Sequence, residues 1–202
     1  MAVGKLLLKL RVEGYEHVPA AGPVVILANH ESYFDPYLVS FVTPRPVVFM
    51  AKTELFEGLG GWLFPRLNTM PVKRGTGDLG AFRNAAKVLR EGGVLGIFPE
   101  GTRSPDGQLQ AAQPGAISIA LRSGVPIVPV AIAGTYDVLP RQGGLRRAPI
   151  AVAAGRPVRF CDLPPEAHRD KRVLAAVGTW VMAEIARLKA GLQAGRVGPD
   201  EH

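Results

Sequence analysis

Short apolar segments alternate with helix-like patterns along most of this 202-residue chain, and that alternation constrains the fold more than any other feature. The apolar segments predict strands at 24–28, 47–50, 94–98, 125–132 and 149–154. Helices are predicted from Asp35-Pro36 onward, over 78–91, near 115–123 and from about Pro165 to Leu192. Such alternation is typical of layered structures with parallel strands. The sequence therefore predicts a single α/β domain whose largely parallel or mixed sheet is flanked by helices.

Two of the predicted helices carry a clear apolar face. In 78–91, Phe82, Ala85, Ala86 and Leu89 share one side, and Gly92-Gly93 ends the helix. The C-terminal helix has a stripe that is expected to be buried, formed by Leu174, Val177, Val181, Ile185, Leu188 and Leu192. Both helices are therefore expected to pack against the sheet.

The length of the chain fits one domain with a core of ample size. Near the N-terminus, Val3, Leu6, Leu7 and Leu10 recur at helical spacing. This pattern indicates an interfacial helix at a membrane surface, or equally a short helix packed on the core. We therefore divide the chain into an interfacial amphipathic helix at 1–11, a folded domain at 12–192 and a flexible tail at 193–202.

The chain is basic, with 24 Lys and Arg residues against 17 Asp and Glu residues and a formal net charge of +7. This excess indicates an anionic partner, which could be nucleic acid, an acidic membrane surface or a phosphorylated substrate. No helix or aromatic motif typical of nucleic-acid readers is present, so nucleic acid is not expected as a partner. Between Asp137 and Asp162 a cluster of cations contains no acid and consists of Arg141, Arg146, Arg147, Arg156 and Arg159.

The longest apolar stretches, 24–28 and 125–133, are far shorter than the ~20 residues that a membrane-spanning helix requires. No signal peptide is evident, so any membrane contact is expected to be peripheral. The single cysteine, Cys161, excludes an intrachain disulfide framework and fits a cytoplasmic location. The histidines show no metal-ligand spacing, so no metal site is expected.

The segment 29–36, NHESYFDP, places a histidine and an aspartate five positions apart. On a regular helix His30 and Asp35 would point ~140° apart, so they can meet only if the chain turns between them. A strand followed by an Asp-capped helix supplies that turn. An imidazole held by a carboxylate removes protons from hydroxyl groups. Spacing alone favours the simpler interpretation, a loop histidine and an ordinary capping aspartate.

Two further segments carry groups that bind anions. FPEGTRS (98–104) follows a buried strand, and its glycine loop, Thr102, Arg103 and Ser104 can offer N–H and O–H donors to a phosphate. PVKRG (71–75) adds Lys73 and Arg74. No G-x-S-x-G nucleophile motif is present, so direct attack by a substrate hydroxyl is a simpler mechanism than a covalent enzyme intermediate.

A competing motif is formed by Gly75, Gly77 and Gly80, which spell G-x-G-x-x-G before a helix. Glu100 lies 20 residues after Gly80, where a ribose-binding acid is expected. This pattern would make the chain a nicotinamide dinucleotide-binding oxidoreductase. The preceding segment 68–74 contains Pro71 and is a poor candidate for a buried strand, which argues against that reading.

In order along the chain, NHESYFDP, PVKRG, FPEGTRS and VPIVPV (125–130) resemble the motifs of the lysophosphatidic acid acyltransferase family. The family is also called 1-acyl-sn-glycerol-3-phosphate acyltransferase and belongs to the glycerolipid acyltransferases. The resemblance covers about 12–190 and implies that 12–192 is an acyltransferase domain. It implies His30 as the general base and Asp35 as the residue that orients it. The implied acceptor-phosphate site consists of Arg74, Glu100, Gly101, Thr102 and Arg103, supported by Pro126.

The resemblance implies transfer of a fatty acyl group from acyl-CoA or acyl carrier protein to the free hydroxyl of 1-acyl-glycerol 3-phosphate, giving phosphatidic acid. It implies no cofactor, an α/β fold with an apolar tunnel for the acyl chain, and peripheral binding to an anionic membrane on its cytoplasmic face. Members often carry a lysine in an F-K-x-G stretch, where this chain has AQPG (112–115) with Gln113. Another lysophospholipid or lipid acceptor is therefore the alternative substrate. The arginine cluster could serve membrane binding or the phosphates of coenzyme A.

Overall fold

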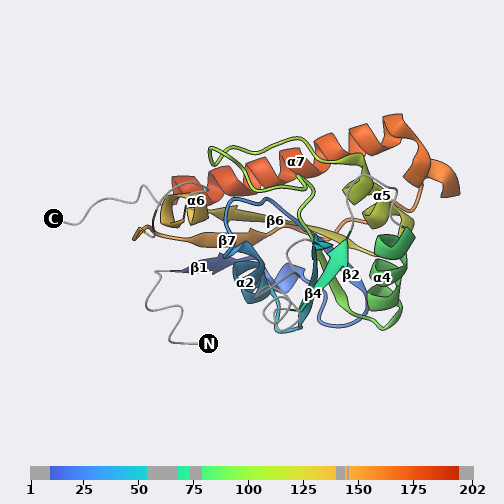
Figure 1. Cartoon of the computed structure of the whole chain (residues 1–202), viewed down its shortest axis with the longest axis horizontal. Helices are drawn as coiled ribbons and strands as arrows, with labels where there is room; N and C mark the ends of the chain where they lie inside the picture. Colours follow the sequence, from blue (N-terminus) through green and yellow to red (C-terminus); the bar gives the residue numbers. More distant parts are fainter. Residues whose placement is uncertain (1–9, 54–67, 73–78, 140–143, 145, 196–202) are drawn as a thin grey trace.

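The computed structural model describes residues 10–53, 68–72, 79–139, 144 and 146–195. Within these residues a seven-stranded sheet has the order β1-β7-β6-β2-β5-β3-β4 (Figure 1). The strands are β1 (Arg11–Glu13), β2 (Val24–Ala28), β3 (Val47–Lys52), β4 (Thr69–Val72), β5 (Val94–Ile97), β6 (Ile127–Ala133) and β7 (Ala151–Ala154). All neighbours pair in parallel except β6 and β7. The prediction of a single α/β domain with a largely parallel or mixed sheet is confirmed.

The α-helices of the described residues are α2 (Asp35–Val39), α4 (Leu79–Arg90), α5 (Pro114–Arg122), α6 (Thr135–Val138) and α7 (Lys171–Ala194). Short 3-10 turns occur at η1 (Tyr15–His17), η2 (Ser40–Val42) and η5 (Pro165–Arg169). The predicted C-terminal helix is divided, because Asp170 caps α7 by accepting hydrogen bonds from the N–H groups of Arg172 and Val173. The prediction of one helix from Pro165 was wrong for its first turn.

The two faces of the sheet are buried by different elements. In β2, Val25 and Leu27 join one core cluster while Val24, Ile26 and Ala28 join the other, as the two-residue period of a strand requires. The first cluster also contains residues of α4, α5 and α7, and the long helix α7 runs along β6 (Figure 1). The second cluster contains residues of α2 and η2. Because both faces are covered, the central strands are apolar throughout their length.

The two edge strands were missed by the sequence patterns. β4 includes Pro71, whose missing N–H is tolerated because β4 pairs with β3 alone. A strand therefore lies within 68–74, but at the edge of the sheet and not among its central buried strands. β1 begins at Arg11, and Leu10 is buried in the core. The predicted interfacial helix at 1–11 therefore cannot include these two residues, and 1–9 lie outside the described residues. The predicted tail is also shortened at its start, since α7 extends to Ala194.

Parallel pairing of β2 and β5 brings the segments that follow them to one edge of the sheet. We call residues 29–35 the histidine turn and residues 98–104 the glycine loop. The N–H of Ser104 in the glycine loop donates to the carbonyl of His30, with 2.7 Å between N and O. Two predicted motif segments are thus in direct contact at the carboxyl ends of the strands, where ligands bind in open α/β sheets.

Candidate active site

The histidine turn folds around one carboxylate oxygen. Oδ2 of Asp35 lies 2.8 Å from Nδ1 of His30 and accepts from the N–H groups of Glu31 at 2.6 Å and Ser32 at 2.7 Å. Asp35 is fully buried and is the first residue of α2. The prediction that it caps this helix was wrong, because its side chain points back into the turn and makes no capping hydrogen bond. This backward orientation is what brings it to His30.

The ring of His30 is held on two sides. Its Nδ1 faces a carboxylate, which only accepts hydrogen bonds, so the proton lies on Nδ1 and leaves Nε2 with a lone pair. The ring also stacks on Phe98 with a centroid distance of 4.0 Å and an interplanar angle of 15°. Phe98 in turn stacks on Phe49 at 5.2 Å. The side chain of His30 is 18% exposed, so the imidazole is fixed in orientation while remaining accessible.

Glu100 supports the histidine turn from the glycine loop. Its Oε1 accepts from the N–H of His30 at 2.9 Å, and its Oε2 accepts from the N–H of Gln110 at 3.0 Å. The side chain is buried, and burial raises the pKa of Glu100 to about 7. The sequence placed Glu100 in the acceptor-phosphate site, but the structure turns its carboxylate toward the backbone of His30.

The two hydrogen bonds that Glu100 accepts also affect the interpretation of the dinucleotide motif. Glu100 was the candidate ribose-binding acid, yet both of its oxygens already accept hydrogen bonds from the protein. Gly75 and Gly77 lie outside the described residues, and Gly80 belongs to α4. The oxidoreductase alternative therefore loses the acidic residue on which it depended.

The remaining residues of the glycine loop differ in what they can offer. Gly101 has a φ of 71°, which favours glycine, and its N–H donates to the carbonyl of Phe98. The guanidinium of Arg103 lies over the ring of Tyr33 at 3.7 Å, and Thr102 lies beside it half-buried. Ser104 was expected to bind phosphate, but it is fully buried and its hydroxyl lies 2.7 Å from the carbonyl of Gln108. Arg103 is thus the charged group of this loop that remains for an anion.

The structure does not place two of the predicted site residues beside His30 and the glycine loop. Arg74, with Lys73, lies outside the described residues. The carbonyl of Pro126 accepts from the N–H of Val25, at the amino end of β2. His30 follows the opposite end of that strand, roughly 16 Å away at about 3.3 Å per residue. The prediction that Pro126 supports the phosphate site does not fit this position.

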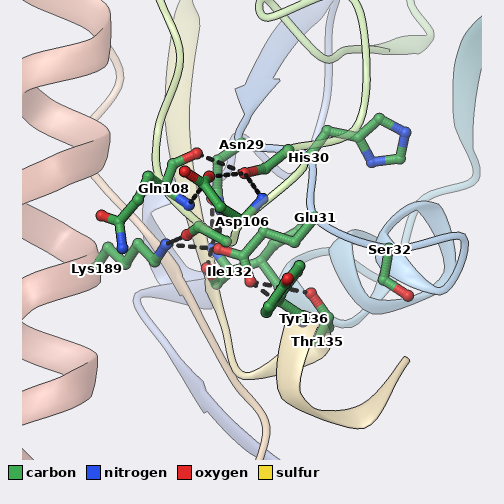
Figure 2. A network of polar contacts seen from close by, with 12 residues as sticks. Asn29, His30, Glu31, Ser32, Asp106, Gln108, Ile132, Thr135, Tyr136 and Lys189 are labelled. Carbon is green, nitrogen blue, oxygen red and sulfur yellow. Dashed lines mark hydrogen bonds and ion pairs between the residues drawn. The ribbon is translucent and has the colours of Figure 1, made fainter. Parts of the chain in front are cut away.

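A buried ion pair that the sequence did not predict adjoins His30. Nζ of Lys189, on α7, lies 2.6 Å from Oε1 of Glu31 (Figure 2). Lys189 stands between Ile185 and Leu192 in the apolar stripe of the C-terminal helix, and all three are buried. A lysine at a position of the buried stripe was the signal that could have identified this pair, because buried charges require partners.

An apolar cavity of about 620 Å³ lies between α4 and α5. Its walls include Phe82, Leu89, Ile119 and Arg122, and it extends to Val125, just before β6. Apart from Val125, none of its lining residues belongs to the four motif segments. The cavity thus shares no lining residue with the group around His30.

The described residues contain no group of three or more His, Cys, Asp or Glu side chains placed to hold a metal ion. Nor does any helix within the described ranges have the length and apolar character needed to cross a membrane.

Comparison with known proteins adds independent information. The Acyltransferase family model matches residues 9–133. The chain is 30% identical over 156 residues to the chloroplastic 1-acyl-sn-glycerol-3-phosphate acyltransferase of Arabidopsis thaliana, a match that covers 74% of this chain and 44% of the plant protein. It is 34% identical over 138 residues to the 1-acyl-sn-glycerol-3-phosphate acyltransferase of Bacillus subtilis, covering 64% of this chain and 67% of the bacterial protein.

Among solved structures, the chain is similar to the 1-acyl-sn-glycerophosphate acyltransferase of Thermotoga maritima, with a TM-score of 0.73 and 28% identity. That similarity covers 92% of this chain and 72% of the Thermotoga chain. The chain spans about half the length of several plant and algal relatives that it matches.

Proposed function

Since this chain belongs to the Acyltransferase family, we propose that it transfers a fatty acyl group to the free hydroxyl of 1-acyl-glycerol 3-phosphate and produces phosphatidic acid. The observation that carries the proposal is the contact between Nδ1 of His30 and Oδ2 of Asp35 at 2.8 Å. This contact leaves Nε2 as a base at the edge of the sheet where substrates are expected. The names of the plant and bacterial relatives support the choice of acceptor.

In the proposed reaction, Nε2 of His30 takes the proton from the acceptor hydroxyl while the oxygen attacks the thioester carbonyl. A C–O bond forms, the C–S bond breaks, and the imidazolium returns its proton to the leaving thiolate. Asp35 stabilises the imidazolium, as the carboxylate does in a catalytic triad. Ser32 is fully buried, which argues against its use as a covalent nucleophile.

The donor is proposed to be the thioester of coenzyme A or of acyl carrier protein, and the chemistry requires no further cofactor. The phosphate of the acceptor is proposed to bind Arg103, whose guanidinium can form two parallel hydrogen bonds to phosphate oxygens. Its position over Tyr33 limits the motion of the guanidinium. Arg74 and Thr102 are proposed to complete this phosphate site.

A membrane surface is the proposed source of the acceptor. Large exposed apolar side chains gather next to His30, where Tyr33, Phe34 and Tyr37 are 57%, 41% and 56% exposed. Aromatic side chains with this exposure are typical of the interface between lipid and water. We propose that this aromatic patch (Tyr33, Phe34 and Tyr37) faces an anionic membrane, peripherally and on its cytoplasmic side. The exposed arginines 146, 147, 156 and 159 are proposed to add charge attraction or to bind coenzyme A.

A different acceptor remains the second candidate because of Gln113. Its N–H donates to the carbonyl of Pro99, so this residue adjoins the glycine loop where related enzymes often carry a lysine. Incubation with a mixture of lysophospholipids and acyl-CoA, followed by mass spectrometry of the products, tests both candidates. Phosphatidic acid as the main product supports the proposal. A different diacyl lipid as the main product assigns the second acceptor, and no acylated lipid refutes both.

A further inference from the structure

The carboxylate of Glu31 is anchored on both oxygens. Oε1 lies 2.6 Å from Nζ of Lys189 and accepts from Nδ2 of Asn29 at 3.0 Å. Oε2 accepts from the hydroxyl of Thr135 and the N–H of Tyr136, both at 3.4 Å. Figure 2 shows Lys189 reaching from α7 to this carboxylate, while the ring of His30 points away from it. Glu31 is therefore fixed from the side of the turn opposite to the imidazole.

The backbone of the same residue acts on the catalytic pair. The N–H of Glu31 donates to Oδ2 of Asp35 at 2.6 Å, and that oxygen is the one that faces Nδ1 of His30. Lys189 is thereby connected to His30 through Glu31 and Asp35. The ammonium also donates to the carbonyl of Gly107 at 2.7 Å, in the segment that continues from the glycine loop. One side chain of α7 thus holds both segments that form the site.

Charge gives this connection its strength. Glu31, Asp35 and Glu100 place three carboxylates around the backbone of the histidine turn, and all three are buried. Burial raises the pKa of Glu31 above its ordinary value, while the charge of Lys189 and its hydrogen bond act in the opposite direction. A buried carboxylate without a cation would be neutralised or would move toward water. Lys189 therefore favours the ionised form of Glu31 and holds its carboxylate in place.

We propose that Lys189 is a positioning residue for the acyl transfer, because its ion pair with Glu31 fixes the turn that presents His30 and Asp35. The role rests on the proposed function for its kinetic consequence and on the geometry alone for its effect on the turn. Removal of the ammonium displaces the turn. Small displacements of a catalytic base lower the rate steeply, by as much as roughly 100-fold for about 1 Å.

The test compares Lys189→Met with Arg187→Met as the matched control. Arg187 lies on the same helix and pairs with Glu184, but this pair is exposed. Rates are measured with 1-acyl-glycerol 3-phosphate and acyl-CoA, at a temperature well below the thermal unfolding midpoint of each variant. Lys189→Met is expected to lower kcat roughly 10- to 100-fold while KM for both substrates changes less than about 2-fold. Arg187→Met is expected to match the wild type, and Lys189→Arg to recover part of the lost kcat.

A double variant separates positioning from stability. Glu31→Gln with Lys189→Met removes both buried charges, so the unfolding midpoint is expected to recover toward that of the wild type. The kcat is expected to remain low because the histidine turn still lacks its ion pair with α7. If kcat recovers together with the midpoint, Lys189 has a structural role only and the proposal is overturned. This variant also carries the test if Lys189→Met alone does not fold.

Hydrogen exchange supplies a readout that is independent of the reaction. The N–H groups of His30, Glu31 and Ser32 are all hydrogen-bonded in the turn. Peptides that cover 29–35 are expected to exchange faster in Lys189→Met and at the wild-type rate in Arg187→Met. Equal exchange in both variants overturns the proposal, even if the enzyme is active. A wild-type protein without activity, but with faster exchange in Lys189→Met, refutes the proposed function and leaves the positioning of the turn supported.

Discussion

Oε1 of Glu100 accepts a hydrogen bond from the backbone N–H of His30 at 2.9 Å, across a sequence separation of 70 residues. The N–H of Ser104 donates to the carbonyl of His30, so the glycine loop holds the backbone of His30 at both its N–H and its carbonyl. The glycine loop therefore has two tasks. Glu100 and Ser104 hold His30, the proposed base, and Arg103 remains for the proposed contact with the acceptor phosphate.

The burial of Glu100 predicts a dependence of stability on pH. Its pKa rises from 4.5 to about 7 on folding, so the folded protein keeps this proton at pH values where the unfolded chain has lost it. The stability that this proton contributes is complete below pH 4.5 and is lost as the pH rises through about 7. Between about pH 5 and about pH 8, the free energy of unfolding of the wild type is expected to fall relative to that of Glu100→Gln. Denaturant titrations at both pH values measure it, and a constant difference would contradict the prediction.

Removal of the proposed base should abolish most of the activity without unfolding the protein. His30→Ala is expected to lower kcat by roughly 10²–10⁴, the usual contribution of general acid–base catalysis. Asp35→Asn is expected to change it in the same direction, because the imidazolium loses its counter-charge. His17→Ala is the control, since His17 lies outside the motif segments and contacts the carbonyl of Ala154. Wild-type turnover in His30→Ala, or a trapped acyl-enzyme, would rule out the mechanism.

Arg103 should distinguish acceptors by their phosphate. Arg103→Ala is expected to raise KM for 1-acyl-glycerol 3-phosphate roughly 10-fold or more, because a charge-assisted bond is lost. It should change the use of an acceptor without phosphate little. Arg122, on α5, lies over the ring of Phe82, outside the glycine loop and the histidine turn, and Arg122→Ala is the matched control. Equal losses on both acceptors would remove Arg103 from the phosphate site.

The aromatic patch should control binding to lipid. Replacement of both Tyr33 and Tyr37 by Ser is expected to weaken binding to anionic vesicles by roughly 10-fold, because apolar area is no longer buried in the interface. Tyr15 is 65% exposed and lies in η1, after β1. Tyr15→Ser, the control, should bind as the wild type does. Vesicle co-sedimentation measures the effect, and equal binding by all three proteins would place the membrane contact elsewhere.

Gly96 should matter because of the rings that stack toward His30. A Cβ at Gly96 would overlap the ring of Phe49, which stacks on Phe98. Gly96→Ala is expected to destabilise the protein by about 1–3 kcal/mol, the usual cost of overpacking, and to lower kcat as Phe98 shifts. Gly115→Ala is the control, because a Cβ there meets no atom within 4 Å apart from its chain neighbours and the backbone of its own helix. Thermal unfolding and initial rates measure both effects, and an unchanged midpoint in Gly96→Ala would contradict the overpacking.

The central part of the fold could be predicted from the sequence because its signals are local. β2, β5 and β6 are buried on both faces, so each appears as a continuous apolar segment. The edge strands β1 and β4 lack that signal, since each pairs with a neighbouring strand on one side only. The cap of α7 also escaped prediction, because Asp170 had to be distinguished from Pro165 as the start of the helix.

Some contacts of the candidate site could be predicted from the sequence, and others could not. The spacing of His30 and Asp35 restricted how they could meet, and the turn that brings them together follows from the end of β2 and the start of α2. The roles of Glu100 and Ser104 could not be predicted, because they depend on the parallel pairing of β2 with β5. The partner of Glu31 lies on α7, more than 150 residues along the chain, and no local pattern connects them.

That distance also affects when the protein can begin to work. Lys189 follows all four motif segments, so a ribosome has produced His30, Asp35 and the glycine loop before it reaches the lysine that holds their turn. Until the last turns of α7 have emerged and packed along β6, Glu31 lacks the cation that pairs with it in the folded protein. With the proposed role of Lys189, the order of synthesis places the start of the proposed acyl transfer after the C-terminal helix has been made and has folded onto the sheet.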